Sequence, residues 1–298
     1  MWFFLSLIAL SMLVARRSTE KHISGKINSL ALAWLQQAVA LPFIIATLFF
    51  AKFYWPQELS TVFWGTMTLY VVLISIDIYC YFKALSLADV SYVAPLLTLT
   101  AIGNIVGAFI ILGQIPSIYG FIGALCIVAG AILTFQGKAK DVANKKNNKR
   151  ALILILVLVG VRSIAANIEV TMLRESNPTT FNFYSSLLTV PLILIMSLVV
   201  IYTNKSDTYK YYWINLKASV KKHHLFLLLI GFTYTVNMLA TYQAKLIGPN
   251  AGYPAAVKSA SVLPMMLIGM FFFKEKIVTI QWVGLCFVIV GLVLLALN

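Results

Sequence analysis

Four ionisable residues lie inside segments that are otherwise apolar: Asp77, Arg162, Glu169 and Lys258. A charged side chain in hydrocarbon costs at least about 2.5–3.5 kcal/mol on insertion scales, so each of them is a candidate functional residue. Arg162 and Glu169 are separated by close to two helical turns and therefore share one face of a helix. From their depths in the segments we predict two ion pairs, Arg162 with Asp77 and Glu169 with Lys258, or two half-pairs that the substrate completes. The alternative is structural, because buried ions also pair simply to lower their own cost of desolvation.

Lys258 is the strongest candidate for contact with a substrate. It lies in residues 252–261, a stretch rich in small side chains that would let a solute approach the backbone. An unpaired lysine at this place would bind a carboxylate or phosphate, or exchange a proton. If Glu169 neutralises it, a neutral or cationic solute is predicted instead. The sequence leaves both substrate classes open.

The segments that carry these residues have the composition of membrane spans. The chain is 61% hydrophobic and 11% charged, with a mean hydropathy of +0.91, which excludes an ordinary soluble domain. Apolar stretches of about 15–25 residues are long enough to cross a bilayer. Ten such spans are predicted, at residues 1–15, 28–50, 62–84, 91–113, 118–135, 151–173, 180–202, 224–245, 251–273 and 277–298.

The basic residues gather at every second loop. Of the 23 lysines and arginines, 18 belong to the loops after the odd-numbered spans and only three to the loops after the even-numbered spans. The positive-inside rule therefore predicts a multi-pass protein of the plasma membrane with cytoplasmic basic loops and both termini extracytoplasmic. This distribution explains the net charge of +14 without a nucleic-acid partner, since no basic patch is interleaved with aromatic residues.

The two halves of the chain resemble each other. Spans 3 to 5 align with spans 8 to 10 at a shift of 161 residues, and span 2 aligns with span 7 at a shift of 149. The matches are Tyr81 with Tyr242, Leu85 with Leu246, Tyr92 with Tyr253, Ala94 with Ala255, Gly123 with Gly284, Gly130 with Gly291 and Pro42 with Pro191. Five spans in each half mean that the second copy enters the membrane from the opposite side.

We therefore predict an all-α integral membrane protein of ten transmembrane helices, arranged as two inverted five-helix repeats. The first repeat is residues 1–135 and the second is residues 151–298, with a basic cytoplasmic linker at residues 136–150. Inverted repeats are typical of secondary transporters, because two similar halves of opposite orientation can exchange conformations around a site at the midplane.

Other residues of the spans could complete such a site. Pro254 and Pro264 would interrupt the ninth span and expose backbone carbonyls. Tyr92, Tyr253 and a group of further aromatic residues could form a binding wall, although tyrosines near span ends more often belong to interfacial belts. That group is Trp34, Tyr79, Tyr81, Tyr234 and Tyr242. Asn167 and Asn237 are candidate polar contacts, and hydrogen bonding between helices is the alternative for them.

The chain resembles the drug/metabolite transporter superfamily of the EamA type. The resemblance rests on the five-plus-five repeat, on residues 273–276 (Phe-Lys-Glu-Lys), on residues 281–284 (Gln-Trp-Val-Gly) and on Gly291. It implies a transporter of small metabolites. Two features depart from the family: Gln114 replaces the acid that Glu275 provides in the second repeat, and family members usually keep both termini in the cytoplasm.

These observations favour a secondary transporter for a small organic metabolite such as an amino acid or another carboxylate. No phosphate-binding loop of the form G-x-x-x-x-G-K-[ST] occurs, and the three histidines lie in basic loops, so an ATP-driven pump and an enzyme are not predicted. No cofactor or metal is expected. A channel or a membrane scaffold remains the rival class. The expected partners are the lipid bilayer, the solute and a coupling ion such as a proton, for a monomer or homodimer.

Overall fold

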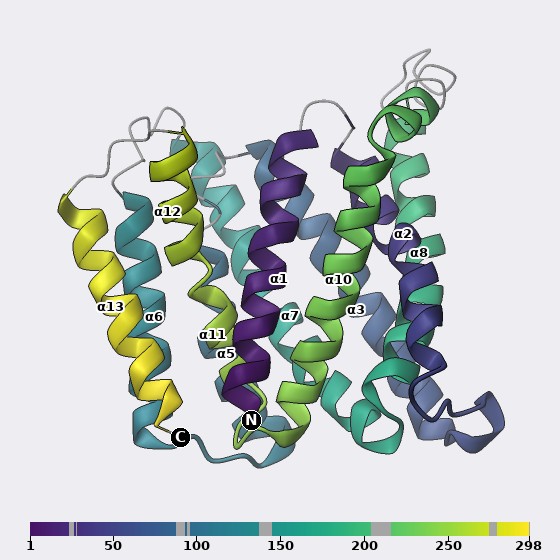
Figure 1. Ribbon diagram of the computed structural model, residues 1–298, viewed down its shortest axis with the longest axis horizontal. Helices are drawn as coiled ribbons and strands as arrows, with labels where there is room; N and C mark the ends of the chain where they lie inside the picture. Colours follow the sequence, from purple (N-terminus) through teal and green to yellow (C-terminus); the bar gives the residue numbers. More distant parts are fainter. Residues whose placement is uncertain are drawn as a thin grey trace.

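The structure is a computed structural model that describes residues 1–23, 27, 29–87, 93, 96–136, 145–203, 216–273 and 279–297. Eleven α-helices have bounds that lie within the described residues, together with the 3₁₀ turn η1 (Pro56–Glu58). The helices are α1 (Trp2–Ile23), α2 (Ser29–Leu48), α3 (Thr61–Leu87), α5 (Thr100–Leu112), α6 (Ile118–Gln136), α7 (Lys145–Glu175), α8 (Pro178–Thr203), α10 (His224–Ile247), α11 (Tyr253–Ser259), α12 (Val262–Phe273) and α13 (Thr279–Ala296). They stand side by side in one bundle (Figure 1).

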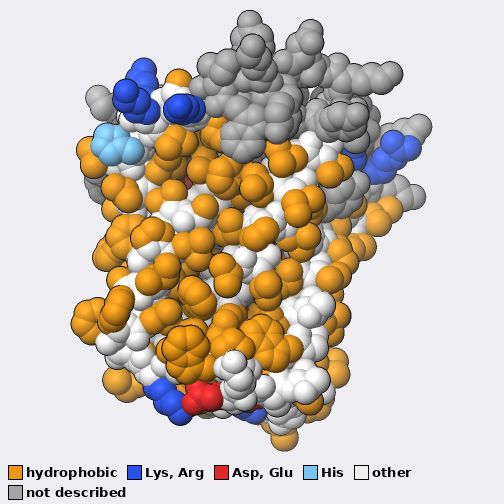
Figure 2. Space-filling view, turned by 90° about the vertical axis from the view of Figure 1, so that its right-hand side faces the viewer, with side chains coloured by type: hydrophobic (Ala, Val, Ile, Leu, Met, Phe, Trp, Pro, Cys, Tyr) orange, Lys and Arg blue, Asp and Glu red, His pale blue; other side chains and the backbone are white. Residues whose placement is uncertain are grey.

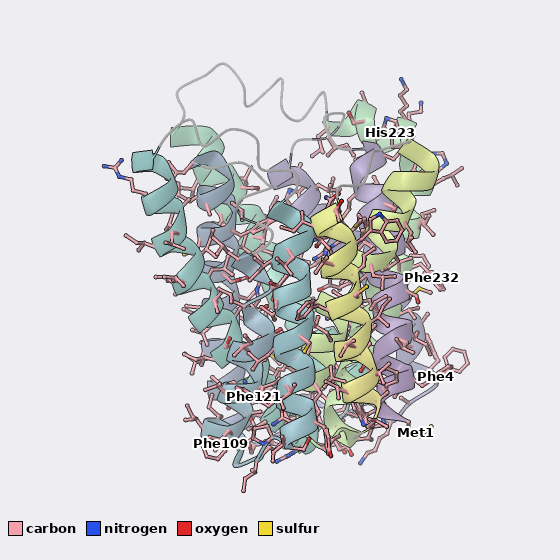
Figure 3. The ribbon with its side chains drawn as sticks, turned by 90° about the vertical axis from the view of Figure 1, so that its left-hand side faces the viewer. Met1, Phe4, Phe109, Phe121, His223 and Phe232 are labelled. Atoms are coloured by element: carbon pink, nitrogen blue, oxygen red, sulfur yellow. The ribbon has the colours of Figure 1, made fainter. Side chains whose placement is uncertain are left out.

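The outside of the bundle is apolar, as a lipid-facing surface requires. Six helices are long and apolar enough to cross a membrane, and Trp34–Leu48, Thr100–Leu112 and Ile118–Thr134 are shorter apolar helices. Figure 2 shows hydrophobic side chains over the middle of one face, with lysine and arginine side chains toward its two ends. Phe4, Phe109 and Phe232 are exposed at the outer surface of the helices (Figure 3). The chain is therefore a multi-pass membrane protein.

The expected ten helices are not confirmed, because the predicted span 251–273 consists of two helices, α11 and α12. The chain turns at Ala260 and Ser261 between them. Pro264 has no N–H group, so the Ala260 carbonyl lacks its usual helical donor four residues on. It accepts a bond from Leu263 N instead, at 3.0 Å. The predicted interruption at Pro264 is thus confirmed.

Two other boundaries differ from the prediction. Helix α1 continues to Ile23, eight residues beyond the predicted end of the first span, and α7 begins at Lys145 within the expected linker. A polar extension of a transmembrane helix costs little once it leaves the hydrocarbon, because its backbone bonds remain satisfied within the helix. The extension of α1 places Arg16 and Arg17 on a helix instead of a loop.

Long helix pairs hold the bundle together. Helix α1 runs along α10, α3 along α7, α2 along α8 and α6 along α13. The contact between α6 and α13 depends on glycine: a Cβ atom on Gly130 would lie 2.5 Å from the Gly284 carbonyl oxygen, and one on Gly123 would lie 2.9 Å from that of Gly291. Small residues of this kind let two helix backbones approach closely.

Both termini lie at the same end of the bundle (Figure 1). The short connections from α2 to α3, α5 to α6, α7 to α8 and α10 to α11 lie at this end as well. We call it the terminal end. Helix α11 extends from this end toward the middle of the bundle, and α12 continues from there to the opposite end, so the turn between them lies inside the bundle (Figure 1).

Candidate functional site

The first ion pair joins α3 to α7. The Arg162 guanidinium donates from Nε to Asp77 Oδ1 at 2.9 Å and from Nη2 to Asp77 Oδ2 at 2.8 Å. The Asp77 side chain is 10% exposed and the Arg162 side chain 35%. A bidentate arginine–carboxylate pair of this geometry satisfies both charges at once. The predicted pairing of these two residues is confirmed.

The second ion pair joins α7 to α10, and its basic partner is Lys245. Lys245 Nζ donates to Glu169 Oε1, and also to the Ala166 carbonyl at 2.9 Å. Both side chains are more than nine-tenths buried. The predicted pair of Glu169 with Lys258 is therefore wrong. Sequence reasoning missed Lys245 because the predicted span ended at that residue, which assigned its charge to a loop, whereas α10 continues to Ile247.

Lys258 has a hydroxyl group as its partner. Its Nζ donates to Thr241 Oγ1 at 3.2 Å, and the same Thr241 hydroxyl donates to the Asn237 carbonyl at 2.7 Å. Lys258 is half-buried. The charges of Lys245, Glu169, Arg16 and Arg17 all act on it electrostatically. These five residues form what we call the central charge cluster.

Helix α1 contributes two arginines that the sequence had assigned to a loop. Arg16 Nε lies 3.3 Å from Glu20 Oε1, and the Arg16 guanidinium stands over the Tyr234 ring at 5.5 Å from its centroid. Arg17 Nη1 donates to Ser261 Oγ at 3.3 Å, next to the break between α11 and α12. The spacing of Arg16 and Glu20 was the available signal, because residues four apart form ion pairs on a helix.

The amide candidates have structural partners. Asn167 Nδ2 donates to the backbone carbonyls of Ser163 at 2.8 Å and Asn104 at 3.2 Å, which ties α7 to α5. Asn237 Nδ2 donates to the Ala9 carbonyl of α1, but its buried Oδ1 has no hydrogen-bond partner among the described residues. The Asn237 carbonyl also accepts the bond from Thr241, the partner of Lys258. Of these two amides, Asn237 is therefore the one that is linked to the central charge cluster.

Two aromatic candidates, Tyr253 and Trp34, belong to different hydrophobic clusters. Tyr253 is buried, accepts a hydrogen bond from Ser117 N at 2.8 Å and packs on Trp2, so it stabilises the terminal end. Trp34 is half-buried and packs in a cluster of α2 and α10 residues. Tyr92, together with the side chain of Tyr79, lies outside the described residues. Tyr253 is therefore better explained as a structural residue than as a ligand contact.

The family comparison bears on what such a site serves. The model of the EamA-like transporter family matches residues 1–136 and 149–297. The chain belongs to this family. The resemblance in the sequence is thus confirmed, and the family is one of membrane transporters for small solutes, in general without enzymatic activity.

Solved structures support the fold of this EamA-like chain. One of them, titled "Crystal structure of protein", shares 12% sequence identity over 99% of this chain and 96% of that one, with a TM-score of 0.68. No curated protein matches the chain. At this identity the likeness concerns the fold alone.

In this EamA-like transporter, the terminal end is closed by hydrogen bonds between connections. Asn250 Nδ2 donates to the Gln114 carbonyl at 3.1 Å, and Ala251 N donates to Gln114 Oε1 at 2.8 Å. The Tyr184 hydroxyl donates to the Tyr54 carbonyl at 3.1 Å. Asn250 is fully buried, whereas Gln114 is half-buried. Gln114 therefore has a structural role in the closed end.

Two of the charged side chains keep exposed surface. Arg17 is exposed even though it bonds to Ser261 on the neighbouring chain segment, and Arg162 keeps a third of its side chain exposed. In this EamA-like transporter, these two arginines thus differ from Asn250 of the terminal end, which is fully buried.

Proposed function

We propose that the protein is a secondary transporter that moves a small organic metabolite bearing a carboxylate, such as an amino acid, across the plasma membrane by alternating access. One observation carries the proposal: Lys258 lies two residues before the turn at Ala260 between α11 and α12 and bonds to a hydroxyl group rather than to a carboxylate. Broken helices hold substrate at the midplane of many secondary transporters.

Repeated packing supports two inverted five-helix repeats, at residues 1–135 and 151–298, as the basis of alternating access. Under the proposed repeat, α3 corresponds to α10 and α7 corresponds to α1. The contact of α3 with α7 therefore corresponds to the contact of α1 with α10, and both contacts occur. Helices α2 and α8 correspond to each other, as do α6 and α13, and the two helices of each pair are in contact. The helix break has a counterpart in the first repeat. Leu99 N bonds to the Leu96 carbonyl, and 161 residues later Ala260 N bonds to the Val257 carbonyl.

The charge distribution supports the orientation of the protein. Most basic residues belong to the loops opposite the terminal end, so those loops are cytoplasmic and both termini extracytoplasmic. In this orientation the accessible Arg17 faces the cytoplasm and the sealed connections around Gln114 and Asn250 face the outside.

The partner of Glu169 supports one of the two substrate classes. A neutral or cationic solute was expected if Glu169 neutralised Lys258. Glu169 pairs with Lys245 instead, which leaves the charge of Lys258 for a ligand. An ammonium group surrounded by hydroxyls and small residues favours an anion or zwitterion.

Counterflow in proteoliposomes tests the proposal. The purified protein is reconstituted and loaded in turn with amino acids, organic anions, quaternary amines and nucleosides, and uptake of labelled compound is measured for wild type, Lys258→Met and the exposed control Lys217→Met. We expect saturable counterflow of an anionic or zwitterionic compound that Lys258→Met loses and Lys217→Met keeps.

Each other result contradicts a specific part of the proposal. Flux that does not saturate and shows no counterflow indicates a channel. Counterflow of a quaternary amine or nucleoside indicates the neutral or cationic class. No flux of any compound, in a protein that is folded and inserted, indicates a membrane scaffold.

A further inference from the structure

Two cations flank the break between α11 and α12. Arg17 of α1 donates to Ser261 Oγ at 3.3 Å, and Ser261 lies three residues after Lys258, with its N–H bonded to the Lys258 carbonyl at 3.1 Å. Residues three apart in a helical turn have neighbouring side chains, about 5–6 Å apart at Cβ. The guanidinium and the ammonium group therefore approach the same short stretch of chain from two helices.

Within the described part of the chain, every carboxylate near these cations has another partner. Glu20 lies against Arg16, Asp77 is bonded to Arg162, and Glu169 is bonded to Lys245. Arg17 and Lys258 bond to the hydroxyls of Ser261 and Thr241. Two positive charges thus remain at the helix break without a neutralising carboxylate among the described residues.

Like charges at such a place repel each other, and the repulsion is strong where water is partly excluded. An anion held between the two groups would remove that cost and gain two charge-assisted interactions. The guanidinium offers a planar fork suited to a carboxylate or phosphate, while the ammonium group acts as a point charge. The neighbouring Ser261 and Thr241 hydroxyls could donate further hydrogen bonds to the same anion.

We propose that Arg17 and Lys258 together bind the substrate and that this substrate carries two negative charges, as a dicarboxylate or a phosphate ester does. The inference rests on the proposed transport function and replaces its substrate class, carboxylates in general, with doubly charged anions. Arg17 is the group that meets the anion first, because it is exposed whereas Lys258 is half-buried.

Ligand-dependent melting of the purified full-length protein tests the inference. Melting temperatures are recorded in an uncharged detergent, at constant ionic strength and about pH 7, where succinate is doubly charged and inorganic phosphate is so in large part. Acetate is the singly charged comparison. A ligand of the folded state raises the melting temperature by mass action, so each titration gives an affinity.

We expect succinate or phosphate to bind wild type about tenfold or more tightly than acetate, since the second charge adds a charge-assisted contact. Arg17→Gln and Lys258→Met should each weaken that binding about tenfold, whereas the exposed control Lys217→Gln should not change it. A response to succinate alone identifies a dicarboxylate, and a response to phosphate alone identifies a phosphate group. Equal binding of acetate, or unchanged binding by Arg17→Gln, would overturn the inference.

The wild-type comparison of singly and doubly charged ligands needs no variant, so the test holds even if Arg17→Gln fails to fold. Arg17→Lys then serves as the milder substitution, and it should keep the preference for two charges with a reduced affinity. Counterflow separates this inference from the proposed function. Saturable counterflow of monocarboxylates without preference for dianions overturns the dianion site alone, whereas no counterflow of any anion overturns the transporter proposal itself.

Discussion

The contact between α3 and α7 and the contact between α1 and α10 pack alike but differ in charge. Under the proposed repeat, with a shift of 149 residues between α1 and α7, Ser6 and Ala9 correspond to Ile155 and Leu158. All four side chains are fully buried. The two helix pairs therefore bury the same positions, as two copies of one packing arrangement would.

The charges do not follow this correspondence. Asp77 and Arg162 form an ion pair between α3 and α7, while the corresponding positions on α10 and α1 hold Met238 and Leu13. The second contact instead carries Arg16 and Arg17 nearer the end of α1. Packing is therefore shared by both halves, whereas charge differs between them. The contact of α3 with α7 neutralises its own charges, and the contact of α1 with α10 leaves positive charge for a ligand.

The largest effect is expected at the most buried pair, Glu169 with Lys245. Lys245→Met leaves the Glu169 carboxylate buried without its cation, and removing one partner of a buried pair costs about 3–5 kcal/mol. The melting temperature in detergent should fall strongly. The double variant Glu169→Gln/Lys245→Met removes both charges and should recover most of the loss. If Lys245→Met is as stable as wild type, this pair does not hold α7 to α10.

The next effect comes from making α3 and α7 resemble α1 and α10. Arg162→Leu and Asp77→Met should each destabilise by about 2–3 kcal/mol, less than at Lys245 because Arg162 is partly exposed. The double variant reproduces the Leu13 and Met238 combination and should be nearly as stable as wild type. Thermal unfolding of the three variants measures the coupling. Equal losses in the single and double variants would contradict the proposed correspondence of the two contacts.

The sequence predicts the features that depend on local rules. The apolar spans follow from hydropathy, the pairing of Asp77 with Arg162 follows from the cost of burying single charges, and the break near Pro264 follows from the missing N–H group. Each of these arguments needs only the residue type and its depth in a span. They locate the framework and one of the two ion pairs.

The rest of the site depends on where helices end, and hydropathy locates ends poorly. Arg16, Arg17 and Lys245 lie at the edges of predicted spans and were assigned to loops, but α1 and α10 continue past them and carry them into the bundle. The partner of Glu169 was therefore wrong. Long basic side chains can reach along a helix, so their position in the sequence does not define their depth.

A smaller effect tests whether the packing is symmetric. A Cβ atom on Gly130 would lie 2.5 Å from the Gly284 carbonyl oxygen, and one on Gly284 would lie 2.6 Å from that of Gly130. Gly130→Ala and Gly284→Ala should therefore destabilise alike, by about 1–3 kcal/mol, because backbone must move apart. Gly160→Ala is the control, since its added Cβ meets nothing within 4 Å. Unequal losses at the two glycines would show that α6 and α13 do not meet symmetrically.

The smallest change in stability is expected for Glu20→Gln. This variant tests directly whether the positive charge on α1 sets the affinity for an anion. Glu20 and Arg16 form a partly exposed pair four residues apart on α1, which contributes about 0.3–0.5 kcal/mol. The Glu20 carboxylate also acts electrostatically on Arg17. Its removal makes the surroundings of Arg17 more positive, so a doubly charged anion should bind severalfold more tightly while the melting temperature without ligand hardly changes. Weaker anion binding by Glu20→Gln would mean that Arg17 needs Glu20 to hold its position, and that positive charge near α1 does not set the affinity.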